Sequence, residues 1–212
     1  MLQVTVLCSD SKHPVNDELA RWRERVAMRA AVRVVRTTAE AEGGDFLFLV
    51  SCQDIVRDNV RSRYRYVLVI HASALPEGRG MSPHVWQILE GRTDLTMSLI
   101  NAEDTVDSGD IWQQVRFRVP RSAMFAEINA AVFSAETELM TWAIDHCDRA
   151  SPSPQRGTPT KHRRRVPADS EIDPSRSLAE CFDLIRVADP ERYPAYFTLH
   201  GRKFRIAIEP IA

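Results

Sequence analysis

Short apolar runs rich in β-branched residues alternate along the first half of the chain with segments of helical periodicity. The runs occupy residues 2–8, 31–35, 45–51, 66–71 and 95–100. Strands that alternate with helices are typical of a parallel sheet, whose strands are buried on both faces and read as continuous apolar stretches. The pattern therefore predicts an α/β fold built on a doubly wound, mostly parallel sheet.

Three helices are predicted between and after these strands. The first begins at Asn16, a good N-cap residue, and places apolar residues at helical spacing. The second has Ser82 as N-cap and Pro83 at its first position, and Gly91 stops it. The third is long and covers about residues 122–147 with a continuous apolar stripe.

The composition changes after the third helix. Residues 1–149 form the predicted main domain, and residues 150–167 are dense in Pro, Ser, Gly and Arg, which is typical of a linker or an extended arm. Residues 168–212 follow as a small αβ appendage, with a short helix that begins at Asp173 and two strands joined by a turn at His200.

Charge and cysteine content exclude several classes of protein. The chain has 44% hydrophobic and 27% charged residues and a net charge of -1, so it exerts no general attraction on nucleic acids. Its four cysteines include no CxxC pair, which favours reduced thiols. No apolar run approaches the roughly 20 residues of a membrane span, and no basic and apolar leader opens the chain. We therefore expect a cytoplasmic protein.

Two polar segments follow apolar strands, which is where open α/β sheets bind ligands. His71 ends the run YVLVIH and leads into a loop whose glycines, Gly78 and Gly80, allow backbone to approach a ligand. The acidic loop NAEDTVDSGD follows the run TMSLI. If the loops converge, a histidine beside a carboxylate is a general acid and base arrangement. The alternatives are a strand-end histidine bonded to a neighbouring loop and a solvated acidic turn.

The segment VIHASALPEGRGMSPHVWQILEG, followed by AEDTVDSGDI, resembles the folate-dependent formyltransferase family. That family includes methionyl-tRNA formyltransferase, glycinamide ribonucleotide transformylase and sugar N-formyltransferases. Its pattern is Asn, one residue, His, then Ser, LP and glycines, with LDTGD or a close variant later. HASALP and VDSGD match in the same order, each at the carboxyl end of a predicted strand. The resemblance implies a Rossmann-like sheet and 10-formyltetrahydrofolate as formyl donor, with no metal.

The resemblance also assigns roles to single residues. It implies that His71 stabilises or protonates the developing oxyanion, and that Asp107 tunes His71 and helps to shuttle protons. The asparagine of the family, two positions before the histidine, is Val69 here. Loss of one oxyanion donor typically costs about 10² to 10³ in rate. Candidate replacements are Ser73, His84 and, as the best placed at a strand end, Asn101.

A third stretch, FLFLVSCQDIV, matches the place where related enzymes hold the pterin with backbone groups that follow a strand. A buried strand with its exit turn explains the same apolar letters equally well. With the glycine-containing and acidic loops, it supplies the candidate cofactor-binding residues Leu49, Ser51, Cys52, Gly78, Gly80 and Asp104.

Residues 163–197 resemble the segment after the catalytic domain in sugar and methionyl-tRNA formyltransferases, but the barrel domain of the tRNA-modifying members does not follow. We therefore expect a small-molecule acceptor rather than a nucleic acid, namely the amino group of a nucleotide-linked amino sugar. The basic run 161–165 is either a phosphate contact or a solvated arm. Alternatives are hydroxyornithine or methionyl-tRNA as acceptor, or a catalytically weakened folate or sugar-nucleotide binding module. The appendage is also a candidate surface for a homodimer contact.

Overall fold

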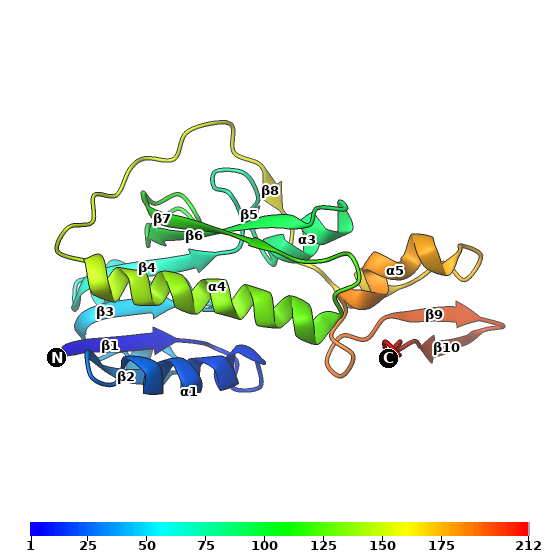
Figure 1. Cartoon of the computed structure of the whole chain (residues 1–212), viewed down its shortest axis with the longest axis horizontal. Coiled ribbons are helices and arrows are strands. Elements are labelled where there is room, and N and C mark those ends of the chain that lie inside the picture. Colours follow the sequence, from blue (N-terminus) through cyan, green and yellow to red (C-terminus); the bar gives the residue numbers. More distant parts are fainter. Residues whose placement is uncertain (212) are drawn as a thin grey trace.

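The computed structural model describes residues 1–211 of the chain and is built around a six-stranded sheet of order β2-β1-β3-β4-β6-β7 (Figure 1). Strands β1 to β4 pair in parallel, β6 is antiparallel to β4, and β7 is antiparallel to β6. The predicted doubly wound, mostly parallel sheet is therefore confirmed. The strands are β1 (Leu2–Leu7), β2 (Ala30–Val35), β3 (Gly44–Leu49), β4 (Tyr64–His71), β6 (Asp94–Asn101) and β7 (Ile111–Arg118).

Strand β7 was not among the predicted strands, and the direction of β6 was not predicted either. β7 lies at the edge of the sheet, so its sequence IWQQVRFR alternates in polarity instead of forming an apolar run. Because β6 is antiparallel to β4, Asn101 at its end lies opposite Leu68, while His71 lies opposite Ser98. The acidic loop therefore begins beside Leu68, three residues before His71 on β4, and has to fold back to reach His71.

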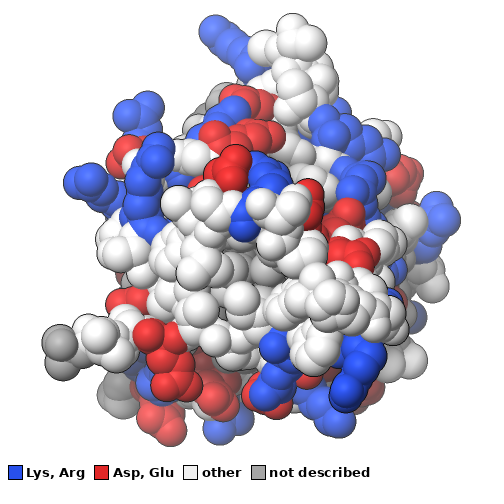
Figure 2. All heavy atoms as spheres, turned by 90° about the vertical axis from the view of Figure 1, so that its right-hand side faces the viewer, with Lys and Arg blue, Asp and Glu red and all other residues white. Residues whose placement is uncertain are grey.

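The last third of the chain forms an arm and an appendage. The arm carries β8 (Lys161–His162), which pairs in parallel with β5 (Arg79–Gly80), and is followed by a 3-10 turn, η2 (Pro167–Ser170). The appendage consists of α5 (Leu178–Arg186) and the predicted hairpin, β9 (Tyr196–Leu199) and β10 (Arg202–Arg205). The face that presents the appendage has a largely uncharged centre bordered by side chains of both signs (Figure 2).

One arginine anchors the appendage to the main domain. Arg186, only 1% exposed, donates from Nη1 to the carbonyl oxygens of Pro120 (3.2 Å) and Ala123 (3.1 Å), directly before α4 (Phe125–His146). Its Nε donates to Asp183 at 2.6 Å. A buried guanidinium needs such partners to offset its lost hydration. The appendage is therefore fixed to the carboxyl side of the sheet.

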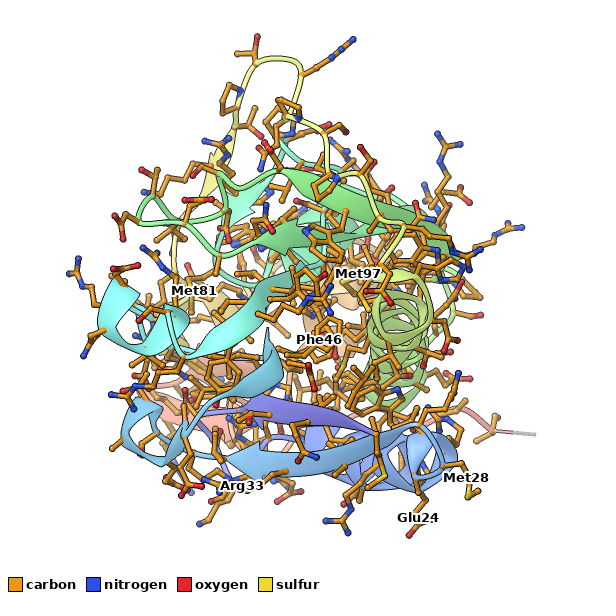
Figure 3. The ribbon with its side chains drawn as sticks, turned by 90° about the vertical axis from the view of Figure 1, so that its left-hand side faces the viewer. Glu24, Met28, Arg33, Phe46, Met81 and Met97 are labelled. Carbon is orange, nitrogen blue, oxygen red and sulfur yellow. The ribbon has the colours of Figure 1, made fainter. Side chains whose placement is uncertain are left out.

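Two apolar layers cover the sheet. The larger layer packs α1 (Val15–Val26) and α4 against one face, where the buried Trp22 donates from Nε1 to Thr141 at 2.9 Å. Figure 3 shows Phe46 and Met97 inside this layer, whereas Glu24 and Arg33 lie at the surface. The smaller layer, on the opposite face, contains Val60 of α2 (Asp58–Arg61), and η1 (Thr38–Glu40) lies at its edge.

Helix beginnings differ from the predicted ones in two places. The first helix has Pro14 as N-cap, and the amide of Asn16 instead donates to the carbonyl oxygens of the preceding loop. Helix α5 begins after Ser177, whose hydroxyl accepts from the backbone of Glu180, rather than at Asp173. Short polar residues in neighbouring loops compete for the cap, and tertiary contacts decide. The helix α3 (Pro83–Leu89) follows Ser82 as predicted.

Within residues 1–211, no helix combines the length and the apolar character that a membrane crossing requires. The same part of the chain contains no cluster of three or more His, Cys, Asp or Glu arranged to hold a metal ion. All four cysteines are free thiols, and three of them are buried.

Glu136 is the least expected residue of the core. It lies in α4 with 7% of its surface exposed, and its Oε2 atom has no hydrogen-bond partner among residues 1–211. Burial without a compensating bond disfavours the charged carboxylate, and it raises the pKa of Glu136 from 4.5 to about 8.

This pKa predicts that the protein loses stability as the pH rises. Between pH 4.5 and about 8 the folded state holds a proton on Glu136 that the unfolded chain releases, which weakens folding by up to about 1.4 kcal/mol per pH unit. Glu136→Gln removes this loss, so its denaturant midpoint relative to the wild type should increase from pH 5 to pH 8. The exposed Glu138→Gln serves as the control. A midpoint difference that stays constant with pH would contradict the prediction.

Candidate active site

His71 lies at the carboxyl end of β4 and is 6% exposed. Its Nε2 atom is 2.8 Å from the carbonyl oxygen of Gly78, and its Nδ1 atom is 3.4 Å from Oδ1 of Asp107. A carbonyl oxygen only accepts hydrogen bonds, so Nε2 carries the proton in this arrangement. A doubly protonated ring would have an acceptor at each N–H. The site can therefore hold the proton that an acid and base residue must take up and return.

The acidic loop folds back to bring Asp107 to His71, because β6 passes His71 at Ser98 and ends three residues further on, at Asn101. Asn101 N donates to Asp110 O at 3.0 Å and closes the loop. A Cβ atom on Gly109 would overlap the carbonyl oxygen of Asn101, so this closure requires glycine. Asp107 itself has the left-handed φ of 56°, and its Oδ2 accepts from Gly80 N at 2.8 Å.

The two glycines predicted to approach a ligand lie between His71 and Asp107. Gly78 (φ 74°) presents its carbonyl oxygen to His71, and Gly80 (φ 102°) presents its N–H to Asp107. A side chain on Gly80 would overlap the backbone of His162 in β8. The structure thus brings together four of the predicted site residues, namely His71, Asp107, Gly78 and Gly80.

The structure does not bring Asn101 to this group. Residues directly opposite one another on antiparallel strands share a face, and Asn101 faces Leu68 on the α4 side of the sheet. Its Oδ1 accepts from Trp112 Nε1 at 2.7 Å. His71 and Val69 alternate with Leu68 along β4 and therefore lie on the opposite face. Asn101 is not positioned to replace the missing asparagine at Val69.

Ser73 lies next to the His71 loop but is enclosed. It is 1% exposed, and its Oγ has no hydrogen-bond partner in the described part of the chain. The hydroxyl borders a cavity of about 10 Å³ that Gly78, Gln87 and His162 also line. Such a volume suffices for about one water molecule. Ser73 is thus placed to bind a buried water beside Gly78.

The candidate pterin loop follows β3 on the same face as Val69. Ser51 has a left-handed φ of 47°, and Cys52 is half-buried, which raises the pKa of its thiol. Asp104 in the facing acidic loop pairs with Arg61 of α2 at 2.8 Å. Partly buried apolar side chains pack on this face, namely Cys52, Val67, Val69 and Ala102.

Sequence reasoning missed His13, which has no motif around it. It lies in the loop after β1, where its Nδ1 accepts from Val15 N at 3.2 Å and its Nε2 is 3.4 Å from Ser51 Oγ. Burial, and then the nearby Arg192, lowers the pKa of His13. This bond pattern leaves His13 neutral and in contact with the candidate pterin loop.

His84 lies in the first turn of α3. Burial, and then the nearby His13, His71 and Arg165, together lower its pKa to about 4. His84 is therefore neutral at physiological pH and adds no charge beside His71.

The fold and the site define a class of protein, a doubly wound α/β domain with a histidine and carboxylate pair at the end of a central strand. Residues 4–144 match the Formyl transferase family, which is about two thirds of the chain. The chain belongs to this family.

Individual relatives agree with this assignment. Methionyl-tRNA formyltransferase of Protochlamydia amoebophila is 24% identical over 171 residues, which are 77% of this chain and 53% of that protein. The chain therefore spans about half the length of this curated relative.

Solved structures share the fold. Methionyl-tRNA formyltransferase from Clostridium thermocellum superposes with a TM-score of 0.83 at 20% identity and covers 100% of this chain and 94% of that one. A 4-N formyltransferase from Francisella tularensis gives 0.78 at 17% identity, with 100% and 98% covered.

The environment of His84 is directly testable. We expect its imidazole to stay neutral as the pH falls from 7 to 5 and to titrate with a midpoint near 4, because burial opposes its charging. The measurement is the ring Cε1–H shift of His84 in a pH series, assigned with His84→Gln. A midpoint near 6.5 would show that the ring is open to solvent.

Proposed function

We propose that this protein is an N-formyltransferase that moves a formyl group from 10-formyltetrahydrofolate to the amino group of a nucleotide-linked amino sugar. The observation that carries the proposal is the pairing of His71 with Asp107 at the end of β4, inside the two motifs that resemble the family. The match to the Formyl transferase family over residues 4–144 supports the chemistry.

Formyl transfer requires the protein to stabilise the developing charge and to move a proton. An uncharged amine attacks the formyl carbon, a C–N bond forms, and the bond from that carbon to the folate nitrogen breaks. His71 stabilises the negative charge that develops on the formyl oxygen once its Nε2–H leaves the carbonyl oxygen of Gly78, and Asp107 holds the ring and stabilises its charged form. The acceptor nitrogen loses one proton, and His71 with Asp107 relays a proton to the folate nitrogen.

The oxyanion site is expected to be weak, because Val69 offers no donor where the family pattern has asparagine. Asn101 does not compensate from the other face of the sheet, and the Ser73 hydroxyl is enclosed. We therefore propose an enzyme whose turnover is limited by oxyanion stabilisation rather than by substrate binding.

Arg165 supports an anionic acceptor. Within the basic run, Arg163 is committed to Asp169 at 2.7 Å and lies over the Trp86 ring. Arg165 is half-buried, and its Nε has no partner among the residues that the structure describes. Burial also lowers its pKa, and it lies near His84. Its Nη2 donates to the carbonyl oxygen of Asp169 at 2.9 Å. A half-buried guanidinium is a charged donor of the kind that binds phosphate oxygens.

Methionyl-tRNA is the second candidate acceptor, since the curated relatives are methionyl-tRNA formyltransferases. A net charge of -1 and surface charges of both signs around the appendage give no support to a long nucleic-acid contact (Figure 2).

The deciding experiment offers the protein 10-formyltetrahydrofolate with 4-amino nucleotide sugars, hydroxyornithine or methionyl-tRNA. Product mass and folate absorbance are followed for the wild type, His71→Ala and Asp107→Ala. We expect formylated nucleotide sugar from the wild type, and a loss of at least about 10²-fold in kcat from either variant. No turnover with any acceptor would contradict the enzyme proposal. If folate or nucleotide then raised the melting temperature, a binding module would replace it.

Restoring the missing asparagine tests the weak oxyanion site. Val69→Asn should raise kcat by about 10-fold or more, because a second donor then faces the formyl oxygen. Val67→Asn is the matched control, since Val67 lies on the same face one alternation further from His71. Equal or lower kcat in Val69→Asn than in the wild type, with both variants folded, would show that another group already supplies this donor.

Arg165→Ala tests the phosphate contact. A charged hydrogen bond contributes about 1.5–3 kcal/mol, so KM for the nucleotide sugar should rise about 10- to 100-fold with kcat little changed. Arg164→Ala, an exposed neighbour, should leave KM unchanged. If both substitutions raise KM equally, the effect belongs to the general charge of the arm.

A further inference from the structure

The arm that follows α4 runs along the two loops that hold His71 and Asp107. Ser153 and Ile111 exchange two backbone hydrogen bonds, of 2.8 and 2.9 Å, which anchor the arm beside β7. Further along, β8 pairs with β5 next to Gly78. Composition alone predicts a linker here, yet the segment between these anchors contacts the site at both of its loops.

Both polar atoms of the Gln155 amide form hydrogen bonds, one with the acidic loop and the other with Arg79 of β5. Its Nε2 donates to the carbonyl oxygens of Asp107 and Gly109, both at 2.9 Å. Its Oε1 accepts from Nη2 of Arg79 at 2.6 Å. The side chain therefore ties the Asp107 loop to β5, the strand whose Gly80 donates to the Asp107 carboxylate.

Thr160 binds the loop that contains Gly78. Its Oγ1 accepts from Gly78 N at 2.8 Å, and its carbonyl oxygen accepts from Arg79 N at 3.0 Å. Gly78 is the residue whose carbonyl oxygen binds Nε2 of His71. Both ring nitrogens of His71 thus face groups that the arm holds, one through Thr160 and one through Gln155.

The conformation of Asp107 requires such support. A non-glycine residue with a φ of 56° is held in a sparsely populated region and persists only when its surroundings fix it. The Asp107 carbonyl oxygen is one of the two that Gln155 binds. Without that bond the loop has less to hold Asp107 in the conformation that aims its carboxylate at His71.

We propose that Gln155 is a positioning residue of the active site, which acts through Asp107, and that Thr160 acts in the same way through Gly78. The arm is then part of the catalytic apparatus rather than a connection between domains. The kinetic part of this inference rests on the proposed formyl transfer, whereas the geometric part does not.

The kinetic test compares Gln155→Ala with Arg156→Ala, its exposed neighbour on the same arm. Misplacement of a catalytic group by about 1 Å can cost 10²-fold in rate, so Gln155→Ala should lose about 10- to 100-fold in kcat. KM for both substrates should stay within about twofold, because the proposed role of Gln155 is to hold Asp107 and not to bind substrate. Gln155→Glu keeps the acceptor for Arg79 but cannot donate to the two carbonyl oxygens, so it should behave like Gln155→Ala.

A second measurement, the rate of chemical modification of His71, can be made without an acceptor substrate. Diethylpyrocarbonate acylates accessible imidazole nitrogens, and peptide mass mapping gives the rate for His71 alone. We expect faster acylation of His71 in Gln155→Ala than in the wild type or Arg156→Ala, because the ring loses its fixed partners. If Gln155→Ala fails to fold, Thr160→Val, which removes the hydroxyl acceptor at nearly equal volume, replaces it with Thr158→Val as control.

The outcomes separate the two proposals. A lower kcat with unchanged KM and faster acylation of His71 supports positioning. Unchanged kcat and an unchanged acylation rate overturn it. If the wild type transfers no formyl group, the acylation rate alone decides, so the positioning role stands or fails independently of the acceptor.

Discussion

The structure of the site depends on one constraint, the fixation of the His71 ring at both of its nitrogens. Nε2 lies 2.8 Å from the carbonyl oxygen of Gly78, and Nδ1 faces the Asp107 carboxylate at 3.4 Å. A ring held in this way has a defined tautomer and a defined orientation, which is what an acid and base residue requires. Three segments that are distant in sequence must therefore converge on the end of β4.

The convergence is achieved with backbone conformations that are costly elsewhere. Gly78 and Gly80 have positive φ, Gly109 has no room for a side chain, and Asp107 is left-handed. The glycines are tolerated because they have no Cβ atom, whereas the left-handed backbone of Asp107 is held by the bond from Gln155. Strain at a site that the rest of the fold over-determines is typical of functional positions.

The sequence predicted the parts of this arrangement that depend on local pattern. The apolar runs marked strands β1 to β4 and β6, and motif resemblance selected His71 and Asp107. The direction of β6 and the existence of β7 were missed, because an edge strand alternates and strand direction is decided by pairing. For the same reason the choice of Asn101 as replacement donor did not anticipate that it lies opposite Leu68, on the other face of the sheet from His71.

The contacts of the arm were beyond prediction for a different reason. Gln155 and Thr160 stand in a stretch without periodicity, and their partners are backbone atoms that are distant in sequence. A side chain that binds backbone atoms has no partner side chain whose residue type could be recognised in the sequence. His13 and Glu136 likewise stand outside any motif, and only burial distinguishes them.

The most direct test of the account is the state of the His71 ring in the wild-type protein. Two-bond ¹H–¹⁵N correlation of the imidazole, assigned with His71→Asn, distinguishes the protonated nitrogen from the unprotonated one. The account predicts a ring protonated at Nε2, with the Nδ1 signal responding to Asp107→Asn while the Nε2 signal does not. A ring protonated at Nδ1 alone, with Nε2 free, would contradict the fixation by Gly78 on which the rest depends.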